Sequence, residues 1–204
     1  MKNKMIVTDI ELEGKNKLIF HYNISGDWKK FFGEESFFVE YDQEIKDVPN
    51  SINIIPFLCN VLPIAWISQA EIQVQTIDLH FEQCIQELMN KYEKMYPSIT
   101  MDFNLIAEQR EENIIDQPTK KAMLFSGGVD SFSTLMEHIE EKPELFTVWG
   151  ADVLLTDKIG WENVSKHIEL VGEQYGLGVN KVKTNFKSFI HQQELNEAVK
   201  QSRR

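Results

Sequence analysis

From Lys121 onward the chain alternates short apolar runs with segments of helical composition. Such alternation is typical of parallel strands that are joined by crossover helices. We therefore predict an α/β fold here, with a parallel sheet covered by helices. The predicted strands and helices follow one another at residues 121–125, 131–141, 145–149, 162–175 and 179–184.

The preceding part of the chain mixes strands and helices in a less regular order. Residues 108–120 are polar and contain Pro118, so they resemble a linker. We predict a small α+β domain at 1–107, a linker at 108–120 and a second domain at 121–204. Within the first domain we expect strands at 5–12, 17–24, 36–41 and 98–107, a bent helix at 51–68 and a second helix at 77–96.

The charge is acidic and unevenly distributed. The net charge is −11, and residues 1–120 hold 20 acidic against 11 basic side chains, a balance of −9. The remaining residues hold 12 against 10, a balance of −2. Because nucleic-acid binders usually present a basic patch, binding to DNA or RNA is not expected. The second domain is the better place for an anionic ligand.

Cysteine content and hydropathy indicate a cytoplasmic protein without a membrane segment. Cys59 and Cys84 are too few for a disulfide framework or a cysteine-rich zinc site. The amino terminus has no signal-peptide apolar region, since charge returns at Asp9. The longest apolar stretch, 54–67, contains two prolines and is too short to span a bilayer.

The most informative segment is Ser126-Gly-Gly-Val-Asp-Ser131, which lies between a predicted strand and a predicted helix. A helix amino terminus offers unpaired N–H groups and a partial positive charge that suit phosphate. Two glycines let the backbone approach an anion closely, and the serine hydroxyls can donate to it. Asp130 would hold a Mg²⁺ ion that bridges the phosphates, or would cap the helix. The spacing fits neither a Walker A loop nor a dinucleotide fingerprint.

This segment closely resembles the PP-loop of the N-type ATP pyrophosphatases, a superfamily that includes asparagine synthetase, GMP synthetase and 7-cyano-7-deazaguanine synthase. The flanking residues Phe125 and Phe132–Leu135 look most like the deazaguanine synthase branch. The acidic first domain is similar to the extra domain of synthase-like proteins of bacterial antiviral defence operons. The resemblance implies a three-layer α/β fold of the adenine nucleotide alpha-hydrolase type, here incomplete and apparently truncated.

The resemblance implies that Mg-ATP is cleaved between its α and β phosphates while an acceptor, still unidentified, is adenylated. Asp130 would be the catalytic residue and the Mg²⁺ ligand, and residues 148–152 would lie near the adenosine. The acceptor would be a deazapurine carboxylate, a tRNA base or a protein terminus, and the acidic surface disfavours tRNA. The expected nucleotide-binding residues are Phe125, Ser126, Gly127, Gly128, Val129, Asp130, Ser131, Phe132, Ser133, Thr134 and Leu135.

The chain departs from the family pattern in two respects. It supplies three of about five expected parallel strands, and it lacks the cysteine cluster that holds zinc in the deazaguanine synthases. The strand at 123–125 would then be an apolar open edge, completed by a protein partner or a second copy. A non-catalytic nucleotide-binding or interaction module is therefore the alternative to a ligase, and a structural fragment without a ligand is a third.

Other side chains carry weaker signals. Asp152 and Asp157 could serve Mg²⁺ or a ribose, or could simply add solubility. Trp149 and Trp161 could stack on a base, although packing in the core is the more common role of tryptophan. The five histidines show no metal-binding spacing.

Overall fold

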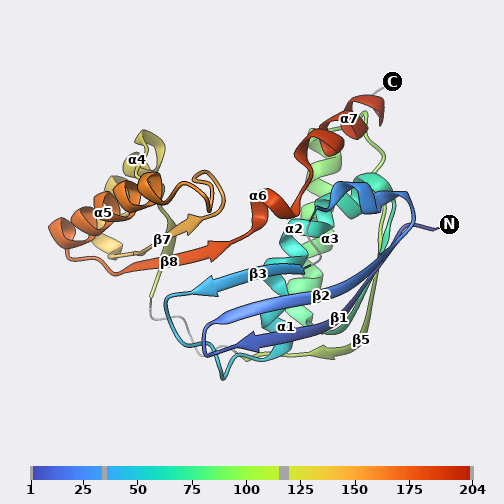
Figure 1. Cartoon of the computed structure of the whole chain (residues 1–204), viewed down its shortest axis with the longest axis horizontal. Coiled ribbons are helices and arrows are strands. Elements are labelled where there is room, and N and C mark those ends of the chain that lie inside the picture. The colour runs from blue at the N-terminus through green and yellow to red at the C-terminus, as the bar shows by residue number, and fades with distance from the viewer. Residues whose placement is uncertain (1, 34–35, 115–119, 203–204) are drawn as a thin grey trace.

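The computed structural model describes residues 2–33, 36–114 and 120–202. Within these residues one eight-stranded mixed sheet runs through the molecule in the order β5-β4-β1-β2-β3-β8-β7-β6 (Figure 1). The chain is thus an α/β protein, and four of the seven strand pairings are parallel. The strands are β1 Lys4–Glu13, β2 Lys17–Ser25, β3 Ser36–Tyr41, β4 Glu71–Asp78, β5 Asn104–Glu111, β6 Ala122–Leu124, β7 Glu144–Trp149 and β8 Val179–Thr184.

The first half of the sheet is built around the β1–β2 hairpin. β3 pairs antiparallel with β2, whereas β4 and β5 join in parallel on the far side of β1. Strand β4 was not predicted, and its last two residues, Ile77 and Asp78, fall in the segment predicted as a helix at 77–96. Its alternation of Ile72 and Val74 was the available signal, and both side chains are buried.

The predicted helix at 51–68 is present as two helices, α1 (Asn50–Asn53) and α2 (Ile55–Ser68). The break falls at Ile54 rather than at a proline. Pro56 lies in the first turn of α2, where a missing N–H costs little, and Pro63 lies inside the helix. Seven of the fourteen residues of α2 are buried, and all seven belong to the first hydrophobic core.

The second half of the sheet confirms the predicted order of strand and helix. Helix α4 (Val129–Glu137) joins β6 to β7, and α5 (Lys158–Tyr175) joins β7 to β8. Both helices lie on the same side of these strands (Figure 1) and share a smaller second core. Strand β6 is the edge strand, and Leu124 on it is 76% exposed. An open apolar edge is thus found where it was predicted.

The two halves of the sheet are connected at β5 and again after β8. Strand β5 continues to Glu111, so residues 108–111, expected to begin a linker, belong to the sheet. After β8 the chain returns to the first core through α6 (Phe186–Phe189) and α7 (Gln192–Ser202). Pro118 lies outside the described residues, and the division into two domains stays a prediction.

Helix α3 (Leu79–Met95) connects β4 to β5, and two 3₁₀ helices lie at Asp27–Phe31 and Ile139–Glu141. Asp78 caps α3, because its carboxylate accepts a hydrogen bond from the Phe81 N–H at 2.8 Å. In the part of the chain that the structure describes, no helix combines the length and the apolar character needed to cross a membrane.

Candidate nucleotide-binding site

The predicted strand, loop and helix all form around the Ser126–Ser131 segment. Strand β6 ends at Leu124, and the Phe125 N–H donates to the Phe146 carbonyl of β7 at 2.7 Å. The loop then crosses Ser126–Gly128, and α4 begins at Val129. The segment therefore leaves the sheet at its edge strand, at the carboxyl end of β6.

The two glycines of this loop differ in what the backbone requires of them. Gly127 has a φ of 76°, in the left-handed region that favours glycine. A methyl group on Gly127 would also lie 2.9 Å from Cδ2 of His167. Gly128 is extended, and a methyl group there would come no closer than 3.5 Å to the Ser126 hydroxyl. The loop is thus fixed at Gly127 and has free space at Gly128.

Hydroxyl groups hold the loop together from within. Ser131 Oγ donates to the Gly128 carbonyl at 2.8 Å and lies 3.4 Å from Ser126 Oγ. Gly128 at the amino end of α4 provides no capping side chain. The first N–H groups of α4 therefore lack a side-chain cap, and they carry the positive end of the helix dipole.

Asp130 lies exposed in the first turn of α4. Among the described residues no group of three or more His, Cys, Asp or Glu side chains could enclose a metal ion. A single carboxylate fits Mg²⁺ nonetheless, because protein-bound Mg²⁺ commonly takes one or two carboxylates together with phosphate oxygens and water. The residues present fit a magnesium ion that arrives with a phosphate ligand.

A cleft of about 400 Å³ opens beside the loop, at the carboxyl ends of β6 and β7. Ser126 lies at one side of it, and Val148 and Asp152 line it from the end of β7 and the loop that follows. Of residues 148–152, which the resemblance places near an adenosine, Val148, Ala151 and Asp152 line the same cleft as Ser126. Trp161 and Val164 of α5 complete the wall.

Some predicted binding residues belong to the core. Leu135 is fully buried and packs in the second core, and its assignment to the nucleotide site stays a prediction. Phe132 makes an edge-to-face contact with Phe125 at 5.1 Å between ring centroids. Thr134 Oγ1 donates to the Asp130 carbonyl within α4, and Ser133 is exposed on the same helix. Phe125 also lines the cleft described above, whereas Phe132, Ser133 and Thr134 are not among its lining residues.

The tryptophans and Asp157 have roles of their own. Trp149 and Trp161 stack on each other at 5.3 Å with nearly parallel rings, and both are half-buried. Trp149 Nε1 donates to the Leu154 carbonyl, which anchors that ring. Asp157 caps α5 by accepting the Gly160 N–H at 2.8 Å. Of the four residues considered for ligand contacts, Trp161 and Asp152 line the cleft.

His167, which α5 places beside Gly127, was not predicted as a site residue. His167 falls within the helix predicted at 162–175, where its spacing from Val164 and Ile168 is typical of a face that packs against the sheet. Contact with the loop depends on how α5 lies against α4, so no local pattern could have identified it.

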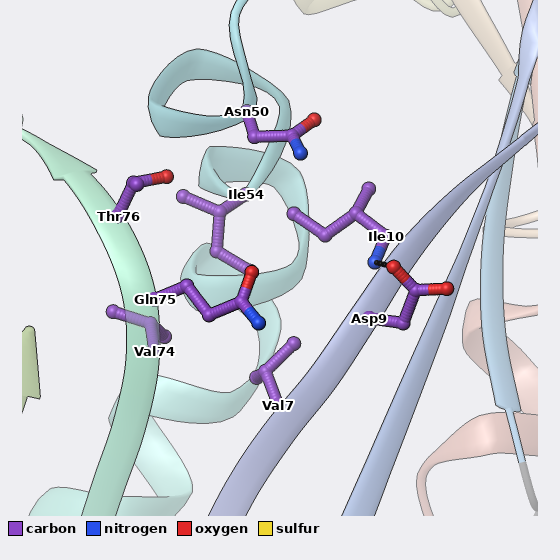
Figure 2. A pocket seen from close by; sticks show the side chains of 8 residues that line it. All are labelled: Val7, Asp9, Ile10, Asn50, Ile54, Val74, Gln75 and Thr76. Carbon is purple, nitrogen blue, oxygen red and sulfur yellow. Dashed lines mark hydrogen bonds between the residues drawn. The ribbon is translucent and has the colours of Figure 1, made fainter. Parts of the chain in front are cut away.

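A smaller pocket in the first half of the molecule cannot hold a nucleotide. It lies between β1, β4 and the region of α1 and α2, among the side chains that Figure 2 shows. Its volume is about 10 Å³, which is the space of one water molecule. The cleft beside the loop offers far more room.

Comparison with family models, curated proteins and solved structures finds no match to this chain. The function must therefore be argued from the residues and geometry of the site itself.

Proposed function

We propose that this chain binds Mg-ATP, with the terminal phosphates at the Ser126–Ser131 loop and the nucleoside in the adjoining cleft. One observation carries the proposal. The glycine-containing strand–loop–helix segment opens directly onto a 400 Å³ cleft at the carboxyl ends of parallel strands. Ligands of open α/β sheets bind at such strand ends, and phosphates favour helix amino termini.

Each part of the site has a distinct task in this proposal. The uncapped N–H groups of α4 bind phosphate oxygens, and Gly128 leaves space for their approach. Asp130 holds Mg²⁺, which would neutralise charge on the phosphates. Val148 and Trp161 contact the nucleoside, and Asp152 is placed to accept a hydrogen bond from a ribose hydroxyl.

The resemblance to the ATP pyrophosphatases supports a specific reaction, of the kind that 7-cyano-7-deazaguanine synthase carries out. An acceptor oxygen would form a bond to the α-phosphorus while the bond from that phosphorus to the bridging oxygen breaks. Pyrophosphate would leave with the bonding electrons, and the loop would hold it. Positioning and charge stabilisation would provide most of the rate enhancement. A role in a cytoplasmic defence system belongs to the same proposal.

A second candidate is a nucleotide-binding module that does not turn over. The exposed edge of β6 favours it, because this strand leads directly into the loop and pairs only with β7 among the described strands. A protein partner or a second copy that adds a strand here would cover Leu124 and complete the cleft.

Calorimetric titration of Mg-ATP into the wild type and Asp130→Ala tests the proposal. We expect saturable, Mg²⁺-dependent binding, weakened by roughly tenfold or more in the variant through loss of a charged ligand. Asp102→Ala, which removes an exposed carboxylate remote in sequence from the loop, is the matched control and should bind like the wild type. A folded wild type that fails to bind Mg-ATP would refute the proposal.

Product analysis separates the two candidates. Pyrophosphate formed in the presence of candidate acceptors, together with an adenylated acceptor, would support the adenylating enzyme. Free AMP would appear once a nitrogen nucleophile attacks the adenylated acceptor and AMP leaves. ADP and phosphate would contradict it. Binding without any product would favour the module.

A further inference from the structure

We propose that His167 is a phosphate-binding residue of this site and selects ligands with a phosphate chain. This inference rests on the proposed function, because it assumes that phosphates occupy the Ser126–Ser131 loop. It adds a residue from a different helix, 36 positions beyond the motif's last serine.

The imidazole lies against the loop at its most constrained point. A methyl group on Gly127 would lie 2.9 Å from Cδ2 and 3.4 Å from Nε2 of His167. The edge of the ring that carries Nε2 therefore faces Gly127. The Phe132 ring, 6.0 Å away between centroids, supports the imidazole from α4.

No hydrogen bond or ion pair with another described residue occupies His167, and its side chain is exposed. Each of the other four histidines has a neighbouring group, which for His80 is the Cys84 thiol at 3.9 Å. His21 and His138 pair with Glu11 and Glu141, and His191 contacts the Lys30 carbonyl. An imidazole held beside a phosphate-type loop, with its nitrogens unengaged, has the properties of a ligand-binding group.

Helix register connects His167 to the cleft. Trp161 and Val164 line the cleft, and His167 follows at the same three-residue spacing. Residues three apart are neighbours on a helix surface. A ligand whose base lies beside Trp161 would thus extend along α5 and present its phosphates to His167 and the loop.

The imidazole suits this position chemically. Nε2 donates a hydrogen bond when it carries the proton, and the protonated ring adds a positive charge. Either form favours a phosphate oxygen over a neutral group. Contact at the loop, distant from the nucleoside end of the cleft, would discriminate ATP from adenosine.

The test compares two variants, His167→Ala and a control, His138→Ala. His138 lies at the carboxyl end of α4, whereas the loop lies at the amino end of that helix. We expect His167→Ala to weaken Mg-ATP binding by roughly tenfold, the effect of losing a hydrogen bond to a charged group. His138→Ala should bind like the wild type. Circular dichroism and thermal melting should show that both variants remain folded.

NMR chemical shifts of the His167 ring test the assignment directly, because they should not change on ligand addition if His167 only supports the fold. Its signals should shift on addition of Mg-ATP and remain unchanged with adenosine. Wild-type binding that His167→Ala leaves intact, or an unshifted ring, would overturn the assignment of His167 and leave the proposed function standing. Absence of binding by the wild type would instead refute the proposed function.

Discussion

At position 127 the loop needs a residue that has no side chain and that adopts a left-handed backbone conformation, and only glycine meets both needs. The backbone of Gly127 is left-handed at a φ of 76°, and His167 occupies the place that a side chain would take. Any side chain here would strain the backbone and displace the imidazole. One residue thus links the shape of the loop to the position of α5.

Glu71 is the clearest electrostatic feature at the scale of single residues. Its side chain is 11% exposed and pairs with Lys2 at 2.8 Å and Lys4 at 3.1 Å, and Asn104 donates to it. The hydrogen bonds from Lys2 and Lys4 outweigh burial and lower the pKa of Glu71 from 4.5 to about 2. These contacts join β1, β4 and β5 near one end.

Glu71 should therefore make stability depend on pH. Because its pKa is lower in the folded state, its contribution is complete above pH 4.5 and is lost as the pH falls toward 2. We expect Glu71→Gln to be less stable than the wild type at pH 6, with the difference shrinking at pH 4 and again at pH 3. Urea denaturation measures this. Glu108→Gln, an exposed control on β5, should show no such trend, and a constant Glu71→Gln difference would contradict the prediction.

Helix α5 is the element on which the site depends most. It carries Trp161, Val164 and His167. Its ends are defined by local signals, because Asp157 caps the amino terminus and Gly176 ends the helix with a left-handed φ of 66°. Gly172 lets the helix approach β8, since a methyl group there would lie 2.5 Å from Val179.

Removing the cap of α5 should destabilise the protein modestly. Asp157→Ala removes the acceptor for the Gly160 N–H, and we expect a loss of about 1 kcal/mol in the free energy of unfolding. Asp157→Asn keeps a capping oxygen and should lose less. Urea denaturation compares the two, and equal losses would show that the cap geometry is not the cause.

At the scale of the whole molecule, the two cores are tied together by one strand pairing and by the returning chain. β3 pairs with β8, and the Asn185 side chain bonds to the backbone of Phe38 and Ser36. Phe189 then enters the first core and packs against Phe32, Phe37 and Phe57.

Phe189→Ala should therefore weaken the first core, although the residue lies late in the chain. The side chain is fully buried, so the expected loss is about 3 kcal/mol or more. Leu170→Ala is the control. Because Leu170 is 54% exposed, this variant should lose much less free energy of unfolding. Denaturation followed by circular dichroism measures both. A Phe189→Ala loss as small as the control's would mean that the C-terminal helices dock only weakly.

Much of the local structure could be predicted from the spacing of apolar residues and from the glycine, proline and capping residues at element ends. The bounds of β3 and β8 agree with the prediction, and α5 ends at Gly176 as expected. The motif lies between a strand and a helix because Phe125, the two glycines and the following apolar spacing act over a few residues. The predicted strand at 98–107 is displaced to Asn104–Glu111, since a short alternating segment has no sharp local boundary.

Neighbouring residues were enough to predict the strand–loop–helix motif, most of the helices and strands, and the acidic charge balance. The folded chain alone shows that β4 lies between β1 and β5, that Phe189 packs in the first core and that His167 lies beside Gly127. These arrangements join residues distant in sequence. Their partners are selected by burial and strand pairing over the whole chain, which no local pattern records.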